Sequence, residues 1–217
     1  LSGAQTLTIN AGTPGTSLLL LGGANPFISV NNSTLIIGPE FDYTSFTKLG
    51  SGGLTVNNIP DFNLPLMSSN IQAGILNLND SGNLNVNDAG FTKYNSGQLN
   101  LAQNMVLSGS GTVTVAAGAI ETRNASNYTG NIVIEDGASY IARGALGTQL
   151  GDTNGTTTVN GAGRLSFQET AQTYNETINV NGFRSDSSIY FNWSAATLAG
   201  AINIGTNTHI GMQTYNN

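Results

Sequence analysis

A short apolar/polar alternation recurs along this chain and restricts it to folds built from short strands. The pattern Gly-x-Leu-x-Val, or a close variant, begins at Gly53, Gly82, Gly97, Gly111 and Gly163. Alternation over so few residues buries one face of a β-strand, and the flanking Gly and Asn residues end the strand at a turn. Units of this kind pack by stacking on one another. The repeats therefore favour an extended surface structure over an enzyme.

The composition indicates a folded chain that is kept soluble by uncharged polar groups. Only 8 % of the 217 residues are charged, against about a quarter in ordinary globular domains. Another 39 % are hydrophobic and fall in the alternating runs, so a core can form and disorder is not expected. The net charge of −6 argues against nucleic acid and anionic membranes as partners, because both require a basic surface.

The absence of cysteine excludes disulfides and thiolate zinc sites. The longest apolar run, Leu18–Leu21, is far shorter than the about 20 residues that span a bilayer. The chain begins at Leu1 without a signal peptide, so we expect a mature or excised segment. We also expect no cofactor, no metal and no membrane span in this segment.

Candidate strands follow one another about every 8–12 residues, which is typical of an all-β fold. They are Leu7–Ile9, Ser17–Leu21, Phe27–Val30, Thr34–Ile37, Leu54–Val56, Ile75–Leu78, Leu84–Val86, Leu99–Leu101, Thr112–Val115, Ile132–Ile134, Ser139–Ile141, Thr157–Val159, Leu165–Phe167, Ile178–Val180, Ile189–Phe191, Ala201–Ile204 and His209–Ile210.

Three all-β architectures fit these strands: a sandwich, an antiparallel barrel and a parallel solenoid. The pairs Asn154-Gly155, Asn160-Gly161 and Asn181-Gly182 are each suited to a two-residue hairpin turn, which favours antiparallel pairing. The short strands instead favour a solenoid, in which similar corner residues recur at every coil.

The spacing of the arginines supports the solenoid. Arg123, Arg143, Arg164 and Arg184 are separated by 20, 21 and 20 residues. Repeats of about 20–50 residues are typical of stacked arrays, and a coil of this length holds three short strands. We therefore predict a single parallel β-solenoid over residues 1–217, with irregular excursions around residues 38–69, where three prolines and four aromatic residues cluster.

In such a solenoid, asparagines at equivalent corners are expected to stack and form hydrogen bonds along the axis. Amides both donate and accept, whereas carboxylates stacked about 4.8 Å apart would repel each other. This explains the preference for Asn over Asp.

Two segments resemble the autotransporter-associated β-strand repeat of bacterial secreted passenger domains. The first comprises residues 127–139 (NYTGNIVIEDGAS), Ala145-Leu-Gly147 and residues 156–165 (TTTVNGAGRL). A similar version of the unit covers residues 192–211. The resemblance implies a right-handed parallel β-helix that is exported across the outer membrane and belongs to a longer cell-surface or shed product.

Two sets of side chains are candidates for ligand binding. Arginines on one edge of the stack could hold an anionic glycan or lipid headgroup through paired hydrogen bonds, although exposed ion pairs with nearby carboxylates are the simpler interpretation. Aromatic residues could stack on sugars or a partner, but packing beneath a loop is more common. The candidates are Arg123, Arg143, Arg164 and Arg184, with Phe41, Tyr43 and Phe46 and, near the end of the chain, Tyr190, Phe191 and Trp193.

Catalytic chemistry has weaker support. His209 is the only histidine and occupies a strand position without a nucleophile motif. Glycosidases place two carboxyl groups about 5–9.5 Å apart, and Asp152 and Glu169 could approach each other on adjacent coils. The other candidate carboxylates of the second half are Glu121, Glu135, Asp136, Glu176 and Asp186. The Asn79–Asp88 stretch lacks the pattern of a calcium loop, so we assign no metal site.

We therefore predict a non-enzymatic, extracellular or cell-surface β-solenoid that acts as a structural or adhesive segment. It would stack end to end with itself into a fibre or form the stalk of a longer chain, with host or surface glycans as candidate ligands. The alternative is a polysaccharide lyase or glycosidase on the same scaffold.

Overall fold

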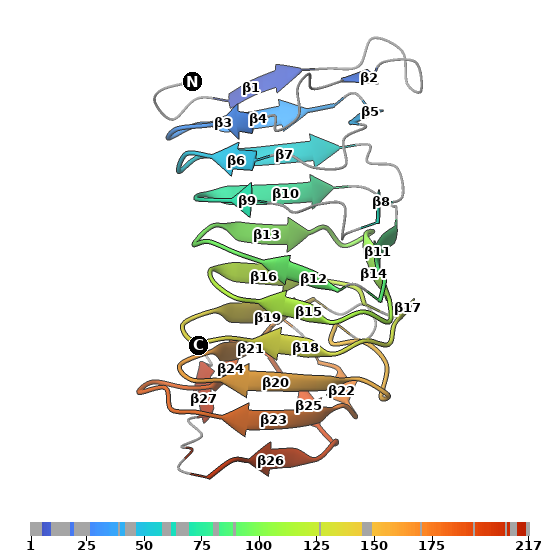
Figure 1. Ribbon diagram of the computed structural model, residues 1–217, viewed down its shortest axis with the longest axis vertical. Helices are drawn as coiled ribbons and strands as arrows, with labels where there is room; N and C mark the ends of the chain where they lie inside the picture. Colours follow the sequence, from blue (N-terminus) through green and yellow to red (C-terminus); the bar gives the residue numbers. More distant parts are fainter. Residues whose placement is uncertain are drawn as a thin grey trace.

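Each alternating run forms a strand with apolar side chains on one side and polar side chains on the other. The computed structural model describes residues 6–9, 18–19, 27–38, 40–41, 47–57, 62–63, 70–79, 83–88, 90–125, 127–144, 149–169, 171–192, 194–206, 208 and 212–215. Within these residues all strand pairs are parallel. The prediction of a parallel β-helix is confirmed (Figure 1).

The longest sheet, here called the long sheet, has ten strands and runs the length of the molecule. In spatial order these are β1 (Thr6–Ile9), β4 (Thr34–Ile37), β7 (Gly53–Asn57), β10 (Ile75–Asn79), β13 (Gln98–Leu101), β16 (Ala119–Thr122), β19 (Ser139–Arg143), β21 (Arg164–Gln168), β24 (Ile189–Asn192) and β27 (Met212–Tyr215).

Shorter sheets form two further faces. The second face contains β2 (Leu18–Leu19), β5 (Glu40–Phe41), β8 (Phe62–Asn63), β11 (Asn83–Val86), β14 (Val106–Gly109), β17 (Asn127–Tyr128), β22 (Thr173–Tyr174) and β25 (Thr197–Leu198). The third face contains β3 (Phe27–Ser29), β6 (Thr47–Leu49), β9 (Asn70–Ile71), β12 (Phe91–Lys93), β15 (Val113–Val115), β18 (Ile132–Ile134), β20 (Thr156–Asn160), β23 (Thr177–Asn181) and β26 (Ile202–Ile204).

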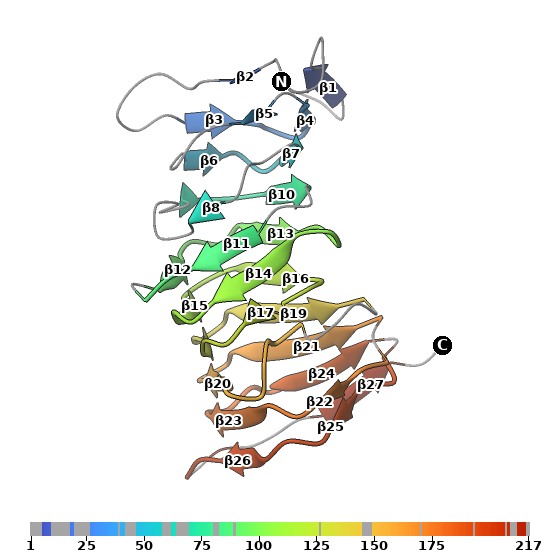
Figure 2. The ribbon, with the colours of Figure 1, turned by 90° about the vertical axis from the view of Figure 1, so that its right-hand side faces the viewer.

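The chain passes from the long sheet to the second face, then to the third face, and back to the long sheet one coil further on. In Figure 1 the third face lies in front with its strands running left, and the long sheet lies behind with its strands running right; Figure 2 shows the second face connecting them. The chain thus turns clockwise as it moves away from its N-terminal end. This is a right-handed solenoid, as the resemblance implied.

The core is built from side chains that stack in columns inside the coil. Along the long sheet, one column of register partners is almost fully buried. It consists of Leu54, Leu76, Leu99, Ile120, Tyr140, Leu165 and Ile189. Because each member contacts the coils above and below, a coil is stable only between neighbours.

The predicted hairpin turns do not join antiparallel strands. Asn160 ends β20 and Gly161 follows it, and the chain then enters β21 in a different sheet. Gly161 has a φ of 54°, so the pair does form a turn. A left-handed residue turns the corner of a coil as well as it turns a hairpin, which is why the motif alone could not distinguish the two.

Glycines occupy corners where consecutive coils touch. Gly118 has a φ of 70°, and a Cβ built on it would lie 2.3 Å from the carbonyl oxygen of Gly97 in the preceding coil. Any side chain would therefore push the two coils apart. The corner needs glycine both for its conformation and for the contact.

Two buried lysines bind the carbonyl groups of other corners. Lys93 is 0 % exposed, and its Nζ donates to the carbonyls of Tyr94 and Asn95 at 2.7 Å and to Ala117 of the next coil at 3.3 Å. Lys48, also fully buried, binds the carbonyls of Leu49, Gly50 and Ala73 in the same way. Burial lowers the pKa of both amines, that of Lys93 to about 8.

Only part of residues 38–69 is described. Those residues include β6 and β7, which pair in register with their neighbours in the stack. The prolines of this stretch lie outside the described residues.

Candidate functional site

The outer surface of the long sheet carries a row of polar side chains that borders a hollow. Thr55 on β7, Asn77 on β10 and Asn100 on β13 are register partners and point outward; these three residues are called the amide row below. They line a hollow of about 330 Å³ together with Leu78, Asn79, Leu101, Ala102, Gln103, Glu121 and Arg123. The hollow extends over four strands of the sheet, because Glu121 on β16 continues the row.

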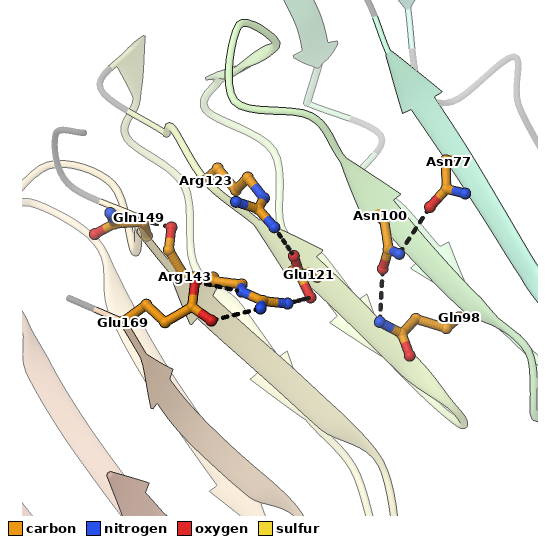
Figure 3. A network of polar contacts seen from close by, with 8 residues as sticks. All are labelled: Asn77, Gln98, Asn100, Glu121, Arg123, Arg143, Gln149 and Glu169. Carbon is orange, nitrogen blue, oxygen red and sulfur yellow. Dashed lines mark hydrogen bonds and ion pairs between the residues drawn. The ribbon is translucent and has the colours of Figure 1, made fainter. Parts of the chain in front are cut away.

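Hydrogen bonds run along the amide row parallel to the solenoid axis (Figure 3). Asn77 Nδ2 donates to Thr55 Oγ1 at 3.1 Å, and Asn100 Nδ2 donates to Asn77 Oδ1 at 2.8 Å. Gln98, on the same strand as Asn100, donates to Asn100 Oδ1 at 2.6 Å. Every amide in the row is held in one orientation.

The same bonding recurs elsewhere, so the predicted asparagine stacking is confirmed. It occurs on strand faces as well as at corners, because any outward position recurs at each coil. The other bonded pairs are Asn57 with Asn79, Asn160 with Asn181, and Asn179 with Asn203.

A four-residue ion cluster closes one end of the hollow. Glu121 is 5 % exposed and accepts from Arg123 at 3.1 Å and from Arg143 at 3.4 Å. Arg143 also makes a two-bond contact with Glu169, at 2.6 and 3.1 Å. This bond raises the pKa of Arg143 and lowers the pKa of Glu169. Figure 3 shows the two arginines reaching Glu121 from different directions.

The expectation that the four arginines lie on one edge of the stack is wrong. Arg143 ends β19 and pairs with Gln168, whereas Arg164 begins β21 and pairs with Ser139. The side chains of Arg143 and Arg164 therefore leave opposite ends of neighbouring strands. The regular spacing of the arginines was misleading because coils differ in length. Ala119 pairs with Ser139, 20 residues further on, whereas Ser139 pairs with Arg164, 25 residues further on.

The remaining two arginines form a separate cluster. Arg164 and Arg184 both bind the carboxylate of Asp186, Arg184 at 2.6 Å. The backbone N–H of Ser187 and these arginines hold the pKa of Asp186 well below its usual range. Arg164 also lies over the ring of Tyr190, 5.1 Å from its centroid. Each of the four arginines thus pairs with a carboxylate, although Arg164 and Arg184 share that of Asp186.

The aromatic candidates are only partly described. Phe41 lies in β5, but its side chain is not described, and Tyr43, Phe46 and Trp193 lie outside the described residues, as does His209. Phe191 stacks on Phe167 with ring centroids 5.2 Å apart. Phe191 thus packs against the core, as the simpler interpretation expected.

The two carboxylates considered for catalysis have separate partners. Glu169 binds Arg143, whereas Asp152 accepts from Thr153 and Asn154 within its own turn. Those local hydrogen bonds lower the pKa of Asp152.

The carboxyl group with the most unusual environment is Glu176. It is 3 % exposed, accepts from Thr157 Oγ1 at 2.7 Å, and has a second oxygen without a hydrogen-bond partner. Burial raises the pKa of Glu176 to about 8. Glu176 was one of the candidate carboxylates of the second half, and the alternation around Ile178 could have indicated that it faces inward.

No group of three or more His, Cys, Asp or Glu side chains within the described residues is arranged to hold a metal ion. No helix in the same ranges is long and apolar enough to cross a membrane.

Comparison with protein-family models, curated proteins and solved structures finds no match to this chain. The fold is therefore established by the register of its own strands, and the resemblance to autotransporter repeats stays a prediction.

Proposed function

We propose that this chain is a structural, non-enzymatic segment of an extracellular or cell-surface β-solenoid, which lengthens by stacking coil on coil. The observation that carries the proposal is the state of the outermost described strands. Leu7 on β1 and Ile204 on β26 belong to core columns, as register partners of Leu35 and Val180. Yet they are 45 % and 59 % exposed, whereas Val180 is 1 % exposed.

These strands also have unpaired backbone edges. β1 and β26 are the outer strands of their sheets within the described residues. An edge strand with an uncovered apolar column offers both hydrogen bonds and hydrophobic contact to another parallel coil. The surface that fits it is a further solenoid coil, from a second copy or from the rest of a longer chain. A head-to-tail contact that does not close produces a fibre.

The composition and the arginine clusters support a structural role on an exported surface. Solubility depends on amides, which form axial hydrogen bonds in successive coils. The arginines that could have marked an anionic site are paired with carboxylates. The similarity of residues 127–165 to autotransporter repeats points to the same compartment. An adhesive or stalk-forming protein with these properties acts through its length and its surface.

The alternative, a glycoside-cleaving enzyme, has one observation in its favour. Asp152 and Glu176 both line a second hollow of about 260 Å³. Their environments move the two pKa values apart, that of Asp152 down and that of Glu176 up to about 8, a pattern found in acid/base pairs. Glu176 is hydrogen-bonded to Thr157 inside the coil, so a structural role accounts for it equally.

The test compares assembly of the unmodified chain with that of the variant Ile204→Lys. Light scattering at rising concentration and electron microscopy should detect linear assemblies of constant width for the unmodified chain. Ile204→Lys should prevent them, because a charge would be buried at the contact. Ile75→Lys is the control, since Ile75 is exposed on the side of the solenoid.

Two results would contradict the proposal. One is assembly by Ile204→Lys that equals assembly of the unmodified chain. The other is release of reducing sugar from a polysaccharide panel by the unmodified chain, abolished in Glu176→Gln, which would favour the enzyme instead. A chain that stays monomeric at all concentrations would restrict coil stacking to neighbouring coils of a longer polypeptide.

A further inference from the structure

The hollow on the long sheet has properties of a binding site that are independent of coil stacking. It is the outer face of β7, β10, β13 and β16, lined by the amide row and bounded by Arg123. In the sequence, Arg123 is notable only as one of four regularly spaced arginines, and no motif marks the amides beside it as ligand-binding groups.

The charge balance of the hollow identifies the class of ligand. Glu121 and Glu169 are matched by Arg123 and Arg143, and each charge is engaged within the cluster. An anionic ligand would have to compete with these carboxylates for the guanidinium groups. The lining therefore suits an uncharged ligand.

The amides retain hydrogen-bonding capacity beyond the bonds within the row. A carboxamide has two N–H donors and an oxygen with two lone pairs. Asn77 uses one donor, to Thr55, and one lone pair, for Asn100. Asn100 likewise uses one donor, to Asn77, and accepts from Gln98. Each amide is thus fixed in orientation and still has a donor and an acceptor for a hydroxyl group, which itself donates and accepts.

Arg123 adds donors at the end of the row. Its side chain is 31 % exposed and reaches Glu121 through Nη2 at 3.1 Å, which leaves most of the five guanidinium N–H groups for a ligand. Ala102 supplies apolar surface in the same hollow.

The spacing of the row matches an extended polymer. Successive strands place one polar side chain about every 4.8 Å along the axis, close to the length of one sugar unit in an extended glycan. We infer that the hollow bounded by Thr55, Asn77, Asn100 and Arg123 binds an uncharged linear oligosaccharide that lies along the solenoid axis. Its hydroxyl groups would bind the amide row, and its end would lie at Arg123.

Isothermal titration with defined probes tests this inference. The probes are the neutral cellopentaose and chitopentaose and the anionic pentagalacturonate. At least one neutral probe should bind, and the double variant Asn77→Ala/Asn100→Ala should weaken its Kd about tenfold, as expected for the loss of two hydrogen bonds. The variant Arg123→Ala, which lies after β16 and outside any strand, should weaken binding about fivefold.

The matched control is Asn179→Ala/Asn203→Ala. These two asparagines form the same axial bond, at 2.9 Å, but on the third face. This variant should bind the neutral probe as the unmodified chain does. Thermal unfolding of each variant shows whether it still folds. If the double variant does not fold, the loss of affinity in Arg123→Ala tests the inference instead.

The inference would be overturned if neither neutral probe binds, if pentagalacturonate binds more tightly than both, or if control and test variants lose affinity equally. The test variants change neither β1 nor β26, so a loss of glycan binding in them does not depend on coil stacking. Failure of the glycan site and failure of coil stacking are therefore distinguishable.

Discussion

Asparagine at outward positions gives each coil a group that both donates and accepts along the axis. Asn77 does both, between Thr55 and Asn100. This property of single residues could be predicted from the sequence, because it depends only on the chemistry of amides and on a short repeat. The hydrogen-bond partners of Glu176 and Lys93 could not be predicted in this way, because they include hydroxyl and carbonyl groups elsewhere in the fold.

The buried carboxyl group of Glu176 predicts that stability falls as the pH rises. The pKa is 4.5 for an ordinary Glu and about 8 for Glu176 in the fold. Between these values the unfolded chain has lost its proton and the folded chain retains it, so stability is lost as the pH rises from 4.5 to about 8. Each pKa unit corresponds to about 1.4 kcal/mol, so the change over this window is on the order of a few kcal/mol.

Glu176→Gln should remove this pH dependence of stability. Near pH 8 the variant should unfold at a higher urea concentration than the unmodified chain. Urea unfolding at several pH values between 4.5 and about 8 measures the free energy of unfolding of both chains. Glu169→Gln is the control, because the Glu169 side chain is 50 % exposed and its pKa is lowered. In this pH window its free energy of unfolding should therefore change with pH as much as that of the unmodified chain does. If the free energy of unfolding changes with pH equally in Glu176→Gln and in the unmodified chain, Glu176 is ionised in the fold.

At the scale of strands and turns, the corners determine how closely coils approach. Gly118 and Gly137 have nearly the same conformation, with φ of 70° and 72°. They differ in space: a Cβ on Gly118 would lie 2.3 Å from the carbonyl oxygen of Gly97, whereas a Cβ on Gly137 meets no atom within 4 Å. Substituting each of the two glycines by alanine therefore separates the free-energy cost of the left-handed conformation from that of the contact between coils.

Gly137→Ala should lower the free energy of unfolding by about 1–2 kcal/mol, the cost of a left-handed alanine. Gly118→Ala should lower it by a further 1–3 kcal/mol or so, because the neighbouring carbonyl must move. Chemical denaturation of both variants provides the comparison. Equal losses would show that coils do not touch at Gly118.

Strands with regular alternation could be predicted from the sequence, and strands with an inward lysine could not. β10 and β23 follow alternating apolar runs that the sequence predicted. β6 and β12 did not stand out, because Lys48 and Lys93 occupy core positions in them. A charged side chain at such a position removes the apolar signal, and its three carbonyl partners are invisible in the sequence.

For the whole molecule, parallel stacking of coils explains the core columns, the axial amide bonds and the uncovered outer strands together. The architecture could be predicted from short strands and an approximate repeat. The arrangement of the arginines could not, since coil length varies: bonded side chains in neighbouring coils are 21 residues apart for Asn160 and Asn181 but 25 for Asn131 and Thr156. A constant repeat length therefore fails to predict which end of a strand a residue occupies several coils away.

The most direct test of parallel stacking is a disulfide between register partners, because the chain has no cysteine of its own. Thr158 on β20 pairs with Asn179 on β23, and adjacent strands are about 4.8 Å apart, within the range that a disulfide bridges. Asn181 lies two residues beyond the partner of Thr158, about 8 Å away by strand geometry. Mild oxidation should close an intramolecular disulfide in Thr158→Cys/Asn179→Cys and leave Thr158→Cys/Asn181→Cys reduced. Failure of the first pair, or equal closure of both, would contradict parallel coils in this register.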